Sequence, residues 1–267
     1  MNLVGLANDV LLKYHKTNLG VEYKQDQFDP VSVADREAED VLRAGVERLL
    51  PGAKILGEEN PLPPEDWRGM VVVIDPLDDS KNYLRGGDLW ASMVAELQDG
   101  EPIRAVVSRP LRNEWYVAEK GKGSFVIRGG VVTPLRVRPT TAVAGSVLVG
   151  RNALAGDIRP IDEVIAQMPF GSIVPEGSIG GKVGLIAEGK ADAFIHTNLK
   201  SGKWDTAPNE LILREAGGVM SDIDGKLLDY TKPTNGWDRF FMAAATPELL
   251  TEMTTKLREI NEQTHSF

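Results

Sequence analysis

An apolar run that ends in a cluster of acidic residues constrains the fold of this chain more than any other feature. Residues 70–74 read Met-Val-Val-Val-Ile, and Asp-Pro-Leu-Asp-Asp-Ser follows directly at 75–80. A short β-branched run that is apolar at every position is typical of a buried strand. We expect this strand to stop at Asp75 and Pro76, so that a turn aims the carboxylates of Asp75 and Asp78 at one point.

Several carboxylates held close together need a cation, because two unit charges about 4 Å apart repel by roughly 1 to 4 kcal/mol. The chain has no cysteine and only three histidines, so oxygen ligands are expected, and these favour magnesium over calcium, manganese or zinc. Magnesium shared between carboxylates and a substrate phosphate indicates phosphoryl chemistry. A solvated turn is an equal alternative for this segment alone, because Asp-Pro and Asp-Asp pairs are common in turns.

Acidic residues also stand at the ends of other predicted elements: Asp35, Glu58, Glu59 and Asp205. We expect Asp35 to cap a helix at 36–50 and Thr206 to cap a helix at 206–216. Read singly, Asp35 and Asp205 could serve only the helix dipole, and the two glutamates could be solvated loop charges. A short helix could also begin at Ser80, with free amides that face a phosphate.

The rest of the pattern predicts a mixed α and β chain without a linker, a repeat or a low-complexity tract. Further helices are expected at 3–14, 161–167, 178–188 and 247–262. An antiparallel meander is expected between 90 and about 137, with strands at 92–97, 103–108, 114–118 and 124–128. The last predicted strands are 146–149, 191–196, 219–223 and 240–245.

Length and charge narrow the possible classes of function. With 267 residues, of which 42% are hydrophobic, we expect one domain of two closely packed halves, at about 1–140 and 141–267. A net charge of −9 argues against binding to a nucleic acid polymer. The chain has no run of 18 apolar residues and no leader-like start. We therefore expect no membrane association and a cytoplasmic location, which the lack of cysteine fits.

Taken together, the acidic segments resemble the inositol monophosphatase-like family of magnesium-dependent, lithium-sensitive phosphatases. The matching segments occur in the order of that family and at about its spacing: 29–35, 57–59, 75–80, 204–205 and 215–218. The resemblance spans most of the chain. It implies a metal-dependent phosphoric monoester hydrolase with a layered αβαβα sandwich, often a homodimer, that acts on a small phosphorylated metabolite or nucleotide.

The resemblance also implies a role for each matching position. Two or three Mg²⁺ ions would be held by the side chains of Glu58, Asp75, Asp78 and Asp205 and by the backbone carbonyl of Leu77. Asp35 and Ser80 would orient and deprotonate the attacking water, and Glu59 would support a metal-bound water. The amides of Asp79 and Ser80 would bind the substrate phosphate.

Two positions depart from the family pattern. Asp79 stands where the family usually has glycine, and Ser80 stands where threonine is commoner. Serine keeps the hydroxyl. Asp79 adds negative charge beside the phosphate and restricts the backbone, so this residue is expected to change either the affinity of the metal cluster or the pose of the phosphate.

The choice of substrate depends on other segments. Residues 80–87 and 177–182 look more like the branch that removes the 3′-phosphate of 3′-phosphoadenosine 5′-phosphate than like the inositol monophosphatases. A bisphosphate carries a second anion, and the candidate partners or substrate contacts are Lys81, Lys182, Lys200 and Lys203. Solvated lysines are the plain alternative. The competing functions are a phosphatase for an inositol or sugar phosphate and a non-catalytic regulator that binds metal or nucleotide.

Overall fold

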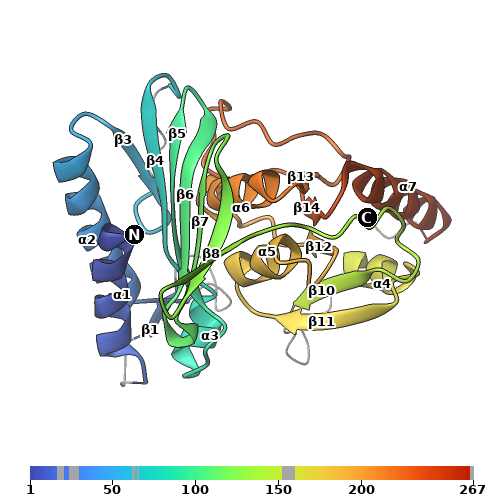
Figure 1. Ribbon diagram of the computed structural model, residues 1–267, viewed down its shortest axis with the longest axis horizontal. Helices are drawn as coiled ribbons and strands as arrows, with labels where there is room; N and C mark the ends of the chain where they lie inside the picture. Colours follow the sequence, from blue (N-terminus) through green and yellow to red (C-terminus); the bar gives the residue numbers. More distant parts are fainter. Residues whose placement is uncertain (17–20, 24–29, 62–63, 65, 152–159, 265–267) are drawn as a thin grey trace.

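The computed structural model describes residues 1–267 except 17–20, 24–29, 62–63, 65, 152–159 and 265–267. The described residues form five layers (Figure 1). From one side to the other, these are the helices α1 (Asn2–Tyr14) and α2 (Val33–Leu49), a seven-stranded sheet, the helices α5 (Ile179–Ala187) and α6 (Lys203–Glu215), a five-stranded sheet, and the helices α4 (Pro160–Ala166) and α7 (Pro247–Thr264). The predicted αβαβα sandwich is confirmed.

The larger sheet has the strand order β3-β4-β5-β6-β7-β8-β9. Its strands are β3 (Lys54–Gly57), β4 (Met70–Asp78), β5 (Ala91–Gln98), β6 (Glu101–Arg109), β7 (Glu114–Glu119), β8 (Gly123–Arg128) and β9 (Val131–Pro134), with the 3₁₀ turn η1 (Pro110–Arg112) between β6 and β7. The pairs from β4 to β9 are antiparallel, which confirms the predicted meander. The sequence pattern did not predict β3 or β9.

One boundary in this sheet differs from the sequence prediction. Strand β4 does not stop at Asp75 and Pro76, because its pairing with β5 resumes at Asp78, opposite Ala91, after an irregularity between Asp75 and Asp78. Pro76 has no N–H to donate to the strand β5, but a residue within a bulge is not paired with the neighbouring strand and needs no such donor. The acidic residues therefore lie on a bulged strand end, and only then does the chain turn into α3 (Ser80–Leu84).

The smaller sheet has the order β11-β10-β12-β14-β13. Its strands are β10 (Val147–Arg151), β11 (Ser172–Glu176), β12 (Ala193–His196), β13 (Val219–Asp222) and β14 (Phe241–Ala244). The pattern missed β11, an edge strand whose first four residues are exposed and which contains a proline. It also missed the ribbon of β1 (Val21–Tyr23) and β2 (Pro30–Ser32).

Two helix starts also differ from the sequence prediction. Helix α2 begins at Val33 and is capped by Ser32, so Asp35 is the third helical residue and closes a capping box. Helix α6 begins at Lys203 after Gly202, so Thr206 is not its cap. In both cases the acidic side chain bonds back to the amide that precedes its helix, at Ser32 and at Gly202.

A continuous hydrophobic core fills the space between the two sheets and around α5 and α6. A second cluster lies between α1, α2 and the outer face of the larger sheet. Because the first core contains residues of both sheets, the division into two halves near residue 140 stays a prediction.

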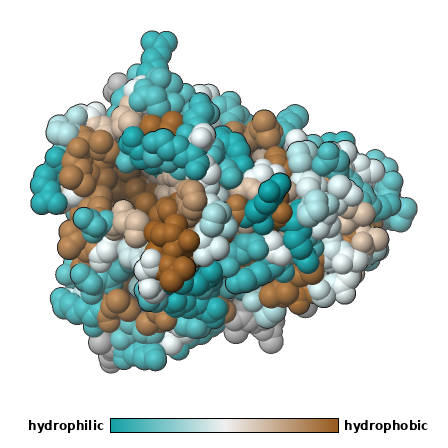
Figure 2. Space-filling view, in the orientation of Figure 1, coloured by the Kyte–Doolittle hydropathy of each residue, from teal (hydrophilic) through white to brown (hydrophobic). Residues whose placement is uncertain are grey.

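One face of the molecule has hydrophobic side chains gathered around a hollow between the first two helices and the larger sheet (Figure 2). Several large hydrophobic side chains of the described residues are exposed, among them Leu6 and Leu12 of α1 and Val131 and Val132 of β9. The homodimer stays a prediction. Over the described residues, every helix is too short or too polar to cross a membrane.

Candidate active site

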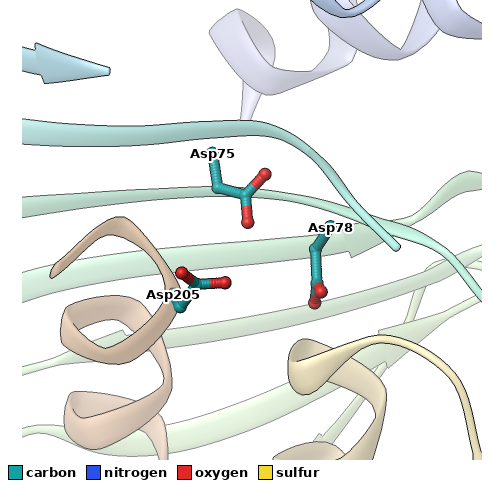
Figure 3. Close-up of side chains that lie close together, drawn as sticks. All are labelled: Asp75, Asp78 and Asp205. Carbon is teal, nitrogen blue, oxygen red and sulfur yellow. The ribbon is translucent and has the colours of Figure 1, made fainter. Parts of the chain in front are cut away.

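Three carboxylates converge where β4 ends and α6 begins (Figure 3). Asp75 and Asp78 come from the bulged end of β4, and Asp205 comes from the first turn of α6. One oxygen of each side chain lies within 4.8 Å of the others. Two segments 127 residues or more apart in the chain thus supply one acidic cluster, at the junction of the larger sheet with the central helices.

Asp75 is the most strongly perturbed member of this cluster. It is buried, one oxygen accepts from the amide of Leu77 at 3.0 Å, and the other has no hydrogen-bond partner. Burial raises the pKa of Asp75 well above its ordinary range, and the neighbouring charges of Glu58, Asp78 and Asp205 raise it further. A buried carboxylate oxygen without a partner is costly unless something positive faces it.

Asp78 is held by the start of α5. The amide of Gly180 donates to Asp78 Oδ2 at 2.8 Å. Burial raises the pKa of Asp78 to about 7, although the amides of Gly180 and Ile179 and the charge of Lys182 oppose the rise. These donors fix one oxygen and favour the charged form.

Asp205 is held by its own helix. The amide of Gly202 donates to Asp205 Oδ2 at 2.6 Å, and the side chain is half-buried. Because this bond fixes the rotation of the carboxylate, Asp205 faces the two aspartates of β4 (Figure 3).

The residues present fit a hard divalent cation. The donors are all carboxylate oxygens, and one of them is buried without a partner. Burial raises the pKa of both Asp75 and Asp78, and the charges of Glu58, Asp78 and Asp205 raise that of Asp75 further. A divalent cation would remove that repulsion, and oxygen ligands suit Mg²⁺. Asp75, Asp78 and Asp205 could hold it, with Glu58 near enough to act on Asp75.

A second pair of side chains stands beside the cluster. Ser80 Oγ lies 3.0 Å from Asp35 Oδ1 and 3.1 Å from the carbonyl of Leu77, both of which can accept its proton. Asp35 is buried, and its other oxygen accepts from the amide of Ser32 at 2.8 Å and from the hydroxyl of Ser32 at 2.6 Å. The predicted pair is therefore in contact, and Asp35 has one fixed orientation.

The loop of Glu58 and Glu59 is fixed by a residue that the sequence pattern did not reveal. Glu39 is buried in α2 and accepts from the amide of Glu59 at 2.7 Å and from the amide of Asn60 at 3.2 Å. Arg43, one turn later, donates to Glu39 at 2.7 Å. A charged residue at an inward position of an amphipathic helix was the available signal.

Asp79, the departure from the family pattern, occupies a turn position that explains the usual glycine. Its backbone is left-handed, with φ 71°, a conformation that glycine adopts freely and that aspartate tolerates. Its carboxylate turns into the protein, where it accepts from the amide of Asn82 at 3.2 Å. Burial raises the pKa of Asp79. The positive charges of Lys182 and Lys81 and the hydrogen bond from the amide of Asn82 oppose this rise.

The two lysines of the central helices differ in position. Lys182 is buried, and its charge acts on both Asp78 and Asp79. Lys203 is buried elsewhere: its ammonium donates to the carbonyls of Tyr230, at 2.8 Å, and Lys232, and lies 3.8 Å from the centre of the Trp67 ring. The ammonium of Lys203 thus supports this loop, and its role in binding substrate stays a prediction.

Two other lysines expected as substrate contacts lie outside the acidic cluster. Lys81 lies in α3, next to the Asp35–Ser80 pair, and Lys200 is exposed in the loop before α6. Asp29, which belongs to the first matching segment, lies outside the described residues.

The fold and the site together define a class of protein: a layered α/β protein whose carboxylate cluster could hold a metal ion beside a serine–aspartate pair. Residues 1–262 match the inositol monophosphatase family. An inositol-1-monophosphatase of Mesorhizobium japonicum is 32% identical over 199 residues, which cover 74% of this chain and 73% of that protein. The 3′(2′),5′-bisphosphate nucleotidase CysQ of Aggregatibacter actinomycetemcomitans is 30% identical over 231 residues, covering 85% and 84%.

A solved structure shows the same fold. An IMPase of Thermotoga maritima superposes with a TM-score of 0.80 at 23% identity, covering 98% of this chain and 95% of that one. The chain belongs to the inositol monophosphatase family. This confirms the resemblance read from the sequence and the predicted enzyme class, a metal-dependent phosphomonoester hydrolase.

Proposed function

We propose that this chain hydrolyses a small phosphomonoester with two or three Mg²⁺ ions held by Glu58, Asp75, Asp78, Asp205 and the carbonyl of Leu77. The observation that carries the proposal is the cluster of three carboxylates next to the Ser80–Asp35 pair. When bound, the ions would lower the pKa of a water and neutralise the charge that develops on the leaving oxygen.

The protein's own residues then position and deprotonate the water. A water beside Ser80 can donate to its hydroxyl, while that hydroxyl donates to Asp35 at 3.0 Å. As the water attacks phosphorus, its proton passes to Ser80 and the proton of Ser80 passes to Asp35. Asp35 is suited to this role because Ser32 fixes its other oxygen.

The phosphate would sit at the turn that leads into α3. The amides of Asp79 and Ser80 begin this turn, whose own backbone bonds run from the later amides of Asn82 and Tyr83 to the carbonyl of Asp79. Lys182 adds positive charge nearby, while Glu59 lies in the loop fixed by Glu39.

Two classes of ester are candidates, and each matches the name of one relative. The position of Lys182 supports 3′-phosphoadenosine 5′-phosphate, because a second anion needs a cation. The ammonium of Lys203 is bound to two carbonyls, and the charge of Asp79 partly balances that of Lys182. Little positive charge therefore remains for a second anion, which favours an inositol or sugar phosphate. We place the inositol or sugar ester first on this ground.

Phosphate release would be measured on 3′-phosphoadenosine 5′-phosphate, inositol monophosphate and fructose 1,6-bisphosphate, with and without Mg²⁺. We expect release that depends on Mg²⁺, with a higher kcat/KM on inositol monophosphate than on either bisphosphate. Preference for the adenosine bisphosphate would reverse our order of substrates. Binding of Mg²⁺ and phosphate without turnover of any ester would favour the non-catalytic regulator.

A further inference from the structure

A buried ion pair joins the two sheets beside the site and has no part in the mechanism above. Arg109 ends β6 of the larger sheet, and Glu176 ends β11 of the smaller one. Arg109 Nη2 donates to Glu176 Oε2 at 2.9 Å, and the two side chains are only 2% and 4% exposed. A second carboxylate, Glu114, contacts Arg109 Nη1 at 3.2 Å. Each buried charge depends on its partner, because an unpaired buried charge is strongly unfavourable.

Glu176 connects this pair to the start of α5. Its Oε1 accepts from the amide of Gly177 at 2.9 Å. Its carboxylate also packs on Gly181, where an added Cβ would lie 2.7 Å from Glu176 Cδ. The amide of Ser178 donates to the carbonyl of Leu89 at 3.0 Å. The start of α5 is therefore fixed to the end of β11 and to the loop that precedes β5.

The same turn controls two acidic residues of the site. The amide of Gly180 donates to Asp78 Oδ2 at 2.8 Å. Gly177 lies so close to the carboxylate of Asp79 that a Cβ would collide with it. Lys182, one turn into the helix, supplies positive charge to Asp78 and Asp79. A shift of this turn would move donor and cation together.

We propose that Arg109 and Glu176 are positioning residues of the metal site: their ion pair fixes the start of α5, and the start of α5 fixes Asp78 for metal binding. The inference rests on the metal site of the proposed function. It connects the interior of the fold to the ligand Asp78 through three contacts in series: Arg109 with Glu176, Glu176 with the amide of Gly177, and the amide of Gly180 with Asp78.

The chain offers a matched control at the other end of the same helix. Glu188 follows the last residue of α5 and pairs with Arg128 of β8 at 2.5 Å. Its side chain is 8% exposed and also accepts from the hydroxyl of Tyr116 at 2.8 Å. Glu176→Gln weakens an ion pair between the two sheets at the end of α5 that contacts Asp78. Glu188→Gln weakens an ion pair between α5 and the larger sheet at the end of the helix away from Asp78.

The test is the affinity of the full chain for Mg²⁺ alone, measured by isothermal titration calorimetry, with the Tm of each variant as a second readout. We expect Glu176→Gln to weaken Mg²⁺ binding by about tenfold, the lower end of the range for residues that support metal ligands. Glu188→Gln should lower the Tm and leave the Mg²⁺ affinity within about twofold of the unaltered chain. Arg109→Lys keeps the charge but loses the forked geometry, so its Mg²⁺ affinity should fall between the two.

Equal Mg²⁺ affinity of Glu176→Gln, Glu188→Gln and the unaltered chain would overturn the inference, because the ion pair would then be structural only. If Glu176→Gln does not fold, Arg109→Lys decides by the same criterion. Binding of Mg²⁺ without hydrolysis of any ester would count against the proposed function and leave this comparison intact. Absence of Mg²⁺ binding by the unaltered chain would overturn both.

Discussion

The starts of α5 and α6 approach the same acidic cluster, but they contribute to it in different ways. Helix α5 gives backbone amides to a carboxylate of another element, since Gly180 donates to Asp78. Helix α6 gives a carboxylate of its own, Asp205, and uses the amide of Gly202 to orient it. The start of α5 thus supports the candidate metal ligand Asp78, whereas the start of α6 supplies the candidate ligand Asp205.

The lysines of the two helix starts extend this contrast. Lys182 in α5 acts on Asp78 and Asp79, whereas Lys203 in α6 binds the carbonyls of Tyr230 and Lys232. Residues of the same type, each near the start of its helix, therefore serve charge balance in one case and loop support in the other. Helix position alone does not assign the role of a lysine, because the elements that pack against it decide.

The largest expected effect comes from removing a ligand. Asp205→Asn and Asp75→Asn should each lower kcat for phosphate release by about 100-fold or more, since losing a metal ligand costs several kcal/mol in the transition state. The fold should survive, because an amide has the shape of a carboxylate and its oxygen can still accept the bond from Gly202. Circular dichroism would verify the fold, and an active Asp75→Asn variant would remove Asp75 from the site.

A pH titration of the metal-free chain tests the burial of Asp78 at the start of α5. Burial raises the pKa of Asp78 to about 7, above its unfolded value of about 4. The stability that this carboxyl contributes is therefore full below about pH 4 and is lost as the pH rises through 7, by up to about 4 kcal/mol. We expect the Tm without metal to fall between pH 5 and pH 8 and Asp78→Asn to flatten this fall. A Tm that rises over the same range in the unaltered chain would contradict the sign.

Exchange of the two lysines for methionine separates their roles. Lys203→Met should lower the free energy of unfolding by about 1 to 3 kcal/mol, because the buried carbonyl of Tyr230 and the partly buried carbonyl of Lys232 lose their donor. Its effect on KM should be small. Lys182→Met should raise KM instead, with a smaller loss of stability. Urea denaturation and steady-state kinetics measure both, and the reverse pattern would support Lys203 as a substrate contact.

The smallest effect is expected at Asp79. Asp79→Gly suits the left-handed backbone but loses the bond to the amide of Asn82, so the free energy of unfolding should change by less than about 1 kcal/mol. Asp79→Asn keeps that bond and removes only the charge. Both variants should bind inorganic phosphate about two- to fivefold tighter if the charge repels it. Tighter binding in the glycine variant alone would point to the backbone.

Much of the site could be predicted from the sequence, because the acidic motifs carry the family pattern. The resemblance found Asp35 and Ser80 as a pair, and their contact is present. Local pattern was less reliable at helix starts: Asp35 and Thr206 were expected as caps, but an acidic residue at the third position reaches back to an earlier amide in both helices. The sequence alone could not distinguish a cap from a capping-box partner.

The supporting residues could not be predicted, because their partners are distant in the chain. Glu39 holds amides 20 and 21 residues away, and Arg109 meets a carboxylate 67 residues away, across two sheets. Only the fold brings such groups together. Strand β11 was missed for a related reason: it lies at a sheet edge, where exposed residues and a proline are tolerated.

The most direct test of the metal site is anomalous scattering from crystals of the chain grown with Mn²⁺, which prefers the same oxygen ligands as Mg²⁺. We predict an anomalous peak within coordination distance of Asp75, Asp78 and Asp205, and loss of that peak in crystals of Asp75→Asn. A fully active chain whose crystals bind Mn²⁺ away from these three carboxylates would contradict the assignment.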